Sequence, residues 1–110
     1  MKRVLSFDVR SMRLAHDEFP DPRDAEGTPA TGVAALDSLG GTEVGIWEMG
    51  SGTARDTEVD EVFVVISGRG TVRFEDGEVV TLSPGVAVRL RAGERTEWDI
   101  TETLRKVYLT

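Results

Sequence analysis

The residues best suited to chemistry form an acidic cluster directly before the apolar run "VFVVI": Asp56, Glu58, Asp60 and Glu61. Carboxylate oxygens at this density could hold a hard divalent cation, whereas zinc, nickel or copper would prefer imidazole or thiolate ligands. On a strand, alternate residues share a face, so Asp56, Glu58 and Asp60 would lie opposite Glu61. The alternation favours a solvated acidic loop and a Glu61 paired to an arginine, with metal binding by Asp56, Glu58 and Glu61 as the alternative.

Aromatic residues in the neighbouring runs predict an apolar pocket around Glu61. If Glu61 faces inward, alternation turns Phe63 inward too, and an inward Thr96 brings Trp98 with it. A carboxyl group in such surroundings has a raised pKa and suits a general acid or base, so Glu61 is the candidate catalytic residue. A mostly apolar cavity with few polar groups is typical of small-molecule sites. The predicted ligand pocket comprises Trp47, Glu61, Phe63, Arg89, Thr96, Trp98 and Tyr108.

Basic residues offer a second possible role for the same cavity. Arg89 and Arg91 alternate with aliphatic residues and therefore share one strand face. Glu61 with Arg89 in one cup could bind a small carboxylate, because a guanidinium grips carboxylates bidentately. The alternative is ordinary charge on an edge strand, which prevents sheets from associating. Lys106 and Tyr108 share a face of the last run and could also reach inward.

The elements that must position these residues are short strands. Gly or Pro recurs about every ten residues, and no stretch of a dozen residues keeps a helical apolar period, so the pattern predicts an all-β domain. We expect a first strand at 3–11, a long loop at 16–32, and an extended segment or single helical turn at 33–41. Hairpin turns are predicted at 68–70 and 75–77.

Composition limits the classes of protein to consider. The chain has 110 residues, which suits one domain, and no cysteine, which excludes disulfides and thiol catalysis. Thirteen Lys and Arg against 20 Asp and Glu give a net charge of −7, which disfavours nucleic acids and anionic membranes as partners. We find no secretory signal, and no apolar run approaches the roughly 18 residues of a membrane helix. These features predict a cytoplasmic protein.

Two spaced motifs resemble the cupin superfamily. Glu61, six residues and Gly68 resemble the end of the first cupin motif, and Gly85, five residues and "RAG" resemble the start of the second. With "GIWEMG", "LSPG" and "LRKVYLT", the chain from about residue 29 resembles small single-domain cupins. The most similar branch includes the cupin domain of (S)-ureidoglycine aminohydrolase.

This resemblance implies a fold and an assembly. Residues 30–110 would form a cupin-type double-stranded β-helix, or jelly-roll barrel, of six to eight strands. Residues 1–29 would precede it as an N-terminal strand or arm. Such an arm often adds to a neighbour's sheet, so the resemblance implies a homodimer, with "RVLSFDVR" as the exchanged segment.

The resemblance also implies a metal site that this sequence does not complete. Cupins usually hold a metal with an H-x-H pair, the glutamate equivalent to Glu61, and a third histidine. Whichever spacing is used, the histidine positions fall on other residues: Arg55 and Thr57 or Ala54 and Asp56, and then Thr96. The single histidine, His16, lies in the N-terminal arm.

Three functions follow from these residues. The first is a cupin that binds a small molecule in its cavity with no cofactor and no histidine-based metal site. The second is a metal-dependent enzyme resembling ureidoglycine aminohydrolase, or another small cupin isomerase or lyase, with a divalent metal. The third is a structural or interaction dimer with a filled cup. The sequence leaves open whether the protein is an enzyme.

Overall fold

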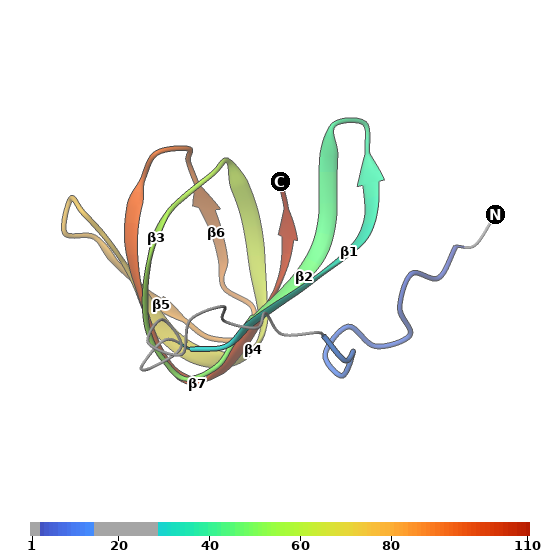
Figure 1. The fold of residues 1–110 in the computed structure, drawn as a ribbon, viewed down its shortest axis with the longest axis horizontal. Helices are drawn as coiled ribbons and strands as arrows, with labels where there is room; N and C mark the ends of the chain where they lie inside the picture. The colour runs from blue at the N-terminus through green and yellow to red at the C-terminus, as the bar shows by residue number, and fades with distance from the viewer. Residues whose placement is uncertain (1–2, 15–28) are drawn as a thin grey trace, which may run out of the picture.

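The computed structural model describes residues 3–14 and 29–110, and these residues form seven strands and no helix (Figure 1). The strands are β1 (Thr31–Leu39), β2 (Thr42–Met49), β3 (Gly52–Thr57), β4 (Glu61–Phe74), β5 (Val79–Leu82), β6 (Ala87–Leu90) and β7 (Arg95–Leu109). All pairs are antiparallel. This confirms the predicted all-β, cupin-type fold. Within the described ranges no helix could cross a membrane.

Two long strands, β4 and β7, organise the barrel. They pair along most of their length, from Val62 opposite Leu109 to Phe74 opposite Thr96. The two halves of β7 pair on their other side with β2 and β3, and the two halves of β4 pair with β6 and β5. Strand β1 adds to the free side of β2. Each long strand therefore belongs to both walls of the jelly roll, and Figure 1 shows both bending at the base of the barrel.

The glycines at 68 and 70 bend β4 rather than end it. The predicted hairpin turn at 68–70 is wrong, because β4 continues to Phe74 and the β4–β7 register shifts between Val65 and Gly70. Gly68 has φ +91°, and a Cβ there would collide with the backbone of Thr103. Glycine at this position lets the strand bulge and cross its neighbour closely, as barrel corners require.

The other predicted breaks lie close to where the structure has them. The turn at 75–77 joins β4 to β5, and Phe74 N donates to the Glu78 carbonyl oxygen at 2.9 Å. Residues 33–39 are extended in β1, so the helical-turn alternative is wrong, and the Gly-Gly pair joins β1 to β2. The predicted strands "TEWDI" and "LRKVYLT" are two halves of β7.

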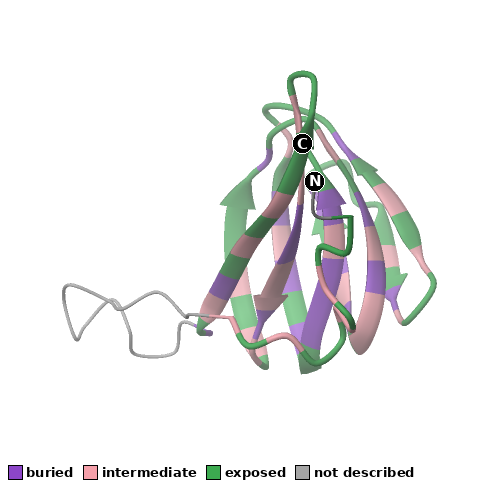
Figure 2. Cartoon of the chain, turned by 90° about the vertical axis from the view of Figure 1, so that its right-hand side faces the viewer, coloured by how far each residue is buried: buried purple, intermediate pink, exposed green. Residues whose placement is uncertain are grey.

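The core lies between the walls and follows the period-two alternation of each strand. Phe63 and Val65 of β4 and Trp98 and Ile100 of β7 are at most 4% exposed. Buried and exposed bands alternate along the strands in Figure 2. Burying each such side chain contributes about 1.5–3 kcal/mol to the stability of the barrel.

The N-terminal segment forms a turn instead of the predicted strand. Asp8 Oδ1 accepts the backbone N–H of Arg10 at 3.0 Å, and Ser11 N donates to the Asp8 carbonyl oxygen at 3.3 Å. An aspartate that bonds its backbone two residues on favours a turn over an extended chain. The Val9 carbonyl oxygen accepts a bond from Arg105 of β7. Residues 3–14 are thus an arm on this chain's own barrel, and their role in a homodimer stays a prediction. His16 lies outside the described residues.

Candidate functional site

A cavity of about 530 Å³ lies among β1, β2, β3 and β7. We call it the cup. Four of the seven predicted pocket residues line it: Trp47, Glu61, Trp98 and Tyr108. Both tryptophans of the chain therefore lie at the cup.

A buried ion pair joins two strands at the cup wall. Lys106 Nζ of β7 lies 2.6 Å from Glu61 Oε2 of β4, and their side chains are 6% and 13% exposed. The sequence predicted an arginine as the partner of Glu61, and this was wrong. Lys106 follows Leu104 and precedes Tyr108 on the inward face of β7, so alternation sends its stem into the barrel.

Three aromatic rings surround the Lys106 ammonium. Nζ lies 4.6 Å from the ring centre of Trp47, 4.3 Å from that of Phe63 and 4.9 Å from that of Trp98. We call these rings the aromatic cage. Each ring face attracts a cation, and the attraction is stronger where water is excluded. Phe63 itself is fully buried and reaches the site through this contact rather than by lining the cup.

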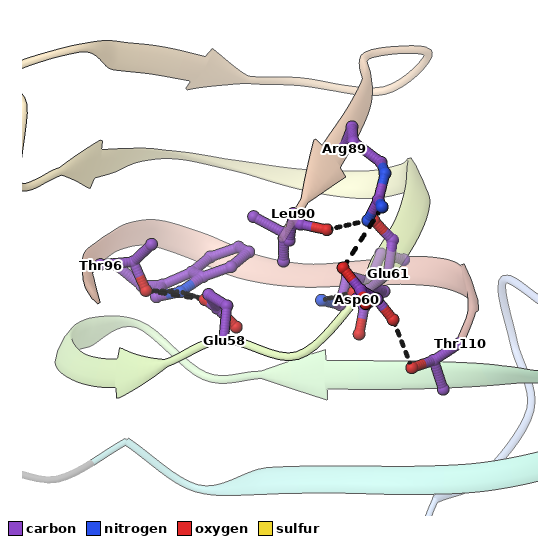
Figure 3. Close-up of polar contacts among 9 residues, drawn as sticks. Glu58, Asp60, Glu61, Arg89, Leu90, Thr96 and Thr110 are labelled. Carbon is purple, nitrogen blue, oxygen red and sulfur yellow. Dashed lines mark hydrogen bonds and ion pairs between the residues drawn. The ribbon is translucent and has the colours of Figure 1, made fainter. Parts of the chain in front are cut away.

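Glu58 is a second buried carboxyl group at the cup. Its Oε2 accepts a hydrogen bond from Thr96 Oγ1 at 2.7 Å and another from Trp98 Nε1 at 3.1 Å. Burial raises the pKa of Glu58, and the bonds from Thr96 and Trp98 partly oppose that rise. Figure 3 shows Glu58 beside Thr96, apart from the contacts of Asp60.

The alternation predicted for the acidic cluster fails at Glu58. Strand β3 ends at Thr57 and β4 begins at Glu61, so the residues between them follow no strand period. Glu58 is 8% exposed and shares the cup with Glu61, whereas Asp60 is exposed. The backbone of Glu58 is fixed by bonds to Gly93 and Glu94, which turn its side chain inward.

Asp60 and Arg89 form an exposed pair outside the cup. Arg89 Nη2 lies 3.3 Å from Asp60 Oδ1 (Figure 3). The same oxygen accepts the N–H of Ala92 at 3.2 Å. The bond from Ala92 and then the one from Arg89 lower the pKa of Asp60. The guanidinium also donates to the Leu90 carbonyl oxygen. Arg89, a predicted pocket residue, is therefore directed away from the cup.

Tyr108 closes the cup from β7. Its hydroxyl donates to Glu43 Oε2 at 2.7 Å, and burial followed by this bond raises the pKa of Tyr108 to about 12. The ring lies across Gly45, where a Cβ would collide with it. Tyr108 is thus a neutral donor already committed to Glu43. Thr96, the last predicted pocket residue, is buried and does not line the cup. Its contact with the cup is the hydrogen bond that it donates to Glu58.

The predicted pocket omitted two buried charged residues that the structure brings to the cup, Glu58 and Lys106. Lys106 had a signal, since it shares the inward face with Tyr108. Glu58 had none in the strand pattern, because its direction depends on backbone bonds to a loop 35 residues later, at Gly93.

The described residues do not fit the metal site that the cupin resemblance implies. They contain no group of three His, Cys, Asp or Glu side chains placed to hold a metal ion, so Asp56, Glu58 and Glu61 do not form one. The Lys106 ammonium also stands 2.6 Å from the Glu61 oxygen that would be a ligand. A fixed positive charge at that distance repels a second cation.

Comparison with known proteins gives a family and a fold. Residues 36–108 match the model of the EutQ-like cupin domain. The structure is similar to that of the Clostridium difficile EutQ protein, with a TM-score of 0.73 and 20% identity over 96% of this chain and 84% of that one. It also resembles a Rhizobium leguminosarum protein of unknown function, with a TM-score of 0.67 and 25% identity over 90% of this chain and 97% of that one. No curated protein sequence matches the chain.

Proposed function

The chain belongs to the EutQ-like cupin domain family, and we propose that its cup binds a small organic carboxylate with Lys106 as the attracting cation. The observation that carries this proposal is the Lys106 ammonium, held in the aromatic cage beside the cup and paired with Glu61. The lysine supplies a fixed positive charge in a barrel whose histidine-bearing relatives would use a metal.

The hydrogen-bonding capacity of Lys106 supports an acceptor as the ligand. An ammonium group has three N–H donors and no acceptor. Among the described residues, Glu61 is its hydrogen-bond acceptor, and the ring faces are its other close contacts. A ligand carboxylate entering the cup would meet donors that Glu61 leaves available. A cationic ligand would meet the ammonium instead and be repelled.

The size and lining of the cup support an organic ligand rather than a bare ion. A volume of about 530 Å³ lies within the roughly 300–1,000 Å³ of small-molecule sites. Trp47, Trp98, Met49 and Val59 give the cup apolar walls. These walls suit a hydrocarbon or aromatic body attached to the acid group, and the open volume favours a binder over a filled cup.

The narrower resemblance, to the (S)-ureidoglycine aminohydrolase branch, remains a prediction. That branch depends on a metal, and the Glu61–Lys106 pair is not suited to one. Metal analysis of protein purified without a histidine tag tests this alternative. A stoichiometric bound metal would favour the metal-dependent enzyme over our proposal.

A pair of isosteric probes tests the proposed ligand class. Because both tryptophans line the cup, their fluorescence reports its occupancy. We expect benzoate to change this fluorescence saturably at pH 6, with an affinity at least tenfold higher than that of neutral benzamide. Equal affinities, or no saturable change with benzoate, would refute a cup selective for carboxylates.

A further inference from the structure

We propose that Glu58 is a proton-linked ligand contact, whose accessible carboxyl oxygen carries a proton and donates it in a hydrogen bond to the bound carboxylate. This inference rests on the proposed function, since it concerns the same cup and ligand class. It adds a specificity-determining residue and a direction of pH dependence to that function.

The geometry of Glu58 leaves one oxygen for a ligand. Both bonds from Thr96 and Trp98 end on Oε2. No side-chain nitrogen or oxygen of the described residues is buried without a partner. Oε1, which accepts neither of those two bonds, is therefore accessible, and Glu58 lines the cup. The carboxyl group is thus held at one oxygen and open at the other.

Thr96 and Trp98 fix the orientation of this carboxyl group. Trp98 Nε1 also lies 3.1 Å from Thr96 Oγ1, so the indole N–H is shared between the two oxygens. Thr96 in turn donates its hydroxyl proton to Glu58. A side chain locked by two buried donors is preorganised, and a preorganised group loses little freedom when a ligand binds.

The charges around Glu58 make its protonation matter for an anion. Arg55 and Asp56 of β3, Glu61 of β4, and Lys106 and Tyr108 of β7 line the same cup. Lys106 is paired with Glu61 and Arg55 with Glu97, and Tyr108 is neutral. The charge of exposed Asp56 raises the pKa of Glu58, and that of Lys106 lowers it. An ionised Glu58 adds one negative charge and repels a carboxylate. Gly93 and Glu94 contact Glu58 through the backbone.

The proton balance of binding follows from this arrangement. Burial raises the pKa of Glu58, so its neutral form persists to higher pH than that of an exposed glutamate. A bound carboxylate stabilises this neutral form further, because two nearby carboxyl groups share one proton more readily than both ionise. Binding above the pKa of Glu58 therefore takes up a proton from solvent, and affinity falls as pH rises.

Benzoate titrations of the full chain between pH 5.5 and pH 8 test this inference. Benzoate is ionised throughout, since carboxylic acids have pKa values of about 4. We expect wild-type affinity to fall toward about tenfold per pH unit once the pH exceeds the pKa of Glu58. Glu58→Gln keeps the shape and a donor but cannot ionise, so its affinity should stay constant with pH. Glu102→Gln, the same substitution at an exposed residue away from the cup, should behave as wild type.

The outcomes separate this inference from the proposed function. A wild-type affinity that does not change with pH, or an equal pH slope in Glu58→Gln, would overturn the role of Glu58 alone. The absence of any saturable signal at all pH values would overturn the proposed function and this inference with it. Calorimetry of wild type in two buffers of different ionisation enthalpy gives a reading that needs no variant. It should show proton uptake at any pH where the wild-type affinity falls with rising pH, and zero uptake there would contradict the proposal.

Discussion

Two cations lie next to each other in β7, and their side chains point to opposite faces of the strand. Lys106 points into the barrel and pairs with Glu61, whereas Arg105 points outward and pairs with Glu48 of β2 at 2.9 Å. The two basic side chains are similarly buried, at 6% and 8% exposure. Burial and pairing alone therefore do not separate a structural cation from a functional one.

The difference lies in what surrounds each pair. The Arg105 guanidinium donates twice to Glu48 Oε1 and once to the Val9 carbonyl oxygen, and it fastens the N-terminal arm to the barrel. The Lys106 ammonium has Glu61, three ring faces and an open cavity. We infer that Arg105 holds the structure together and that Lys106 is available to a ligand. The comparison can be tested by changing one pair at a time.

The largest expected effect is the loss of stability in Lys106→Met. This change leaves Glu61 buried without its counter-charge, and breaking one partner of a buried pair costs about 3–5 kcal/mol. The free energy of unfolding from urea titrations measures the loss. A matched double variant, Glu61→Gln with Lys106→Met, should recover most of it because no charge is then left unpaired. If the single and the double variant lose the same free energy of unfolding, an unpaired Glu61 charge is not the cause of the loss.

Arg105→Lys should have a smaller effect, of about 1–2 kcal/mol, because lysine keeps the charge but loses the fork of donors to Glu48 and Val9. Urea titration measures the change. We also expect residues 3–14 to become more accessible to limited proteolysis while benzoate affinity stays at the wild-type value. A large fall in affinity would contradict the division between the two faces of β7.

The raised pKa of Glu58 predicts a modest pH dependence of the free energy of unfolding. Its pKa is raised above the ordinary value of 4.5, so the folded state binds more protons than the unfolded state between the two values. The stabilising contribution is complete below pH 4.5 and is lost as pH rises through the folded pKa. Urea midpoints of wild type should therefore fall relative to those of Glu58→Gln over this window. If the urea midpoint of wild type instead rises relative to that of Glu58→Gln as pH rises, the folded state favours the ionised form of Glu58, which contradicts this prediction.

The smallest effect is expected for Arg89→Ala at the exposed pair with Asp60. Exposed ion pairs contribute little, and water replaces the lost contact. Asp60 has a lowered pKa, so what the pair contributes is present above pH 3.8 and lost as pH falls. We expect no measurable change in the urea midpoint at pH 7 or in benzoate affinity. A clear loss of affinity would restore Arg89 to the pocket that the sequence predicted.

The sequence predicted the elements well where side-chain pattern decides them. Alternation correctly sent Phe63 of β4 and Trp98 of β7 inward, and turn residues marked the break at 75–77. It failed where long-range contacts decide. Gly68 reads as a turn, but its close approach to Thr103 makes it a bulge in a continuing strand.

The candidate site shows the same division. Trp47, Glu61, Trp98 and Tyr108 lie at the cup, and their part in binding a ligand stays a prediction. The partner of Glu61 could not be found from strand alternation, because the pairing depends on the register between β4 and β7, which no local pattern encodes. The inward turn of Glu58 is likewise set by backbone bonds to Gly93 and Glu94.

The central claim is that Lys106, and not its neighbour Arg105, recruits a carboxylate to this barrel. Its most direct test compares benzoate affinity, measured by tryptophan fluorescence at pH 6, in two folded proteins: the Glu61→Gln and Lys106→Met double variant, and Arg105→Lys. We predict at least a tenfold loss in the double variant and wild-type affinity in Arg105→Lys. Equal affinities in the two variants would contradict the claim.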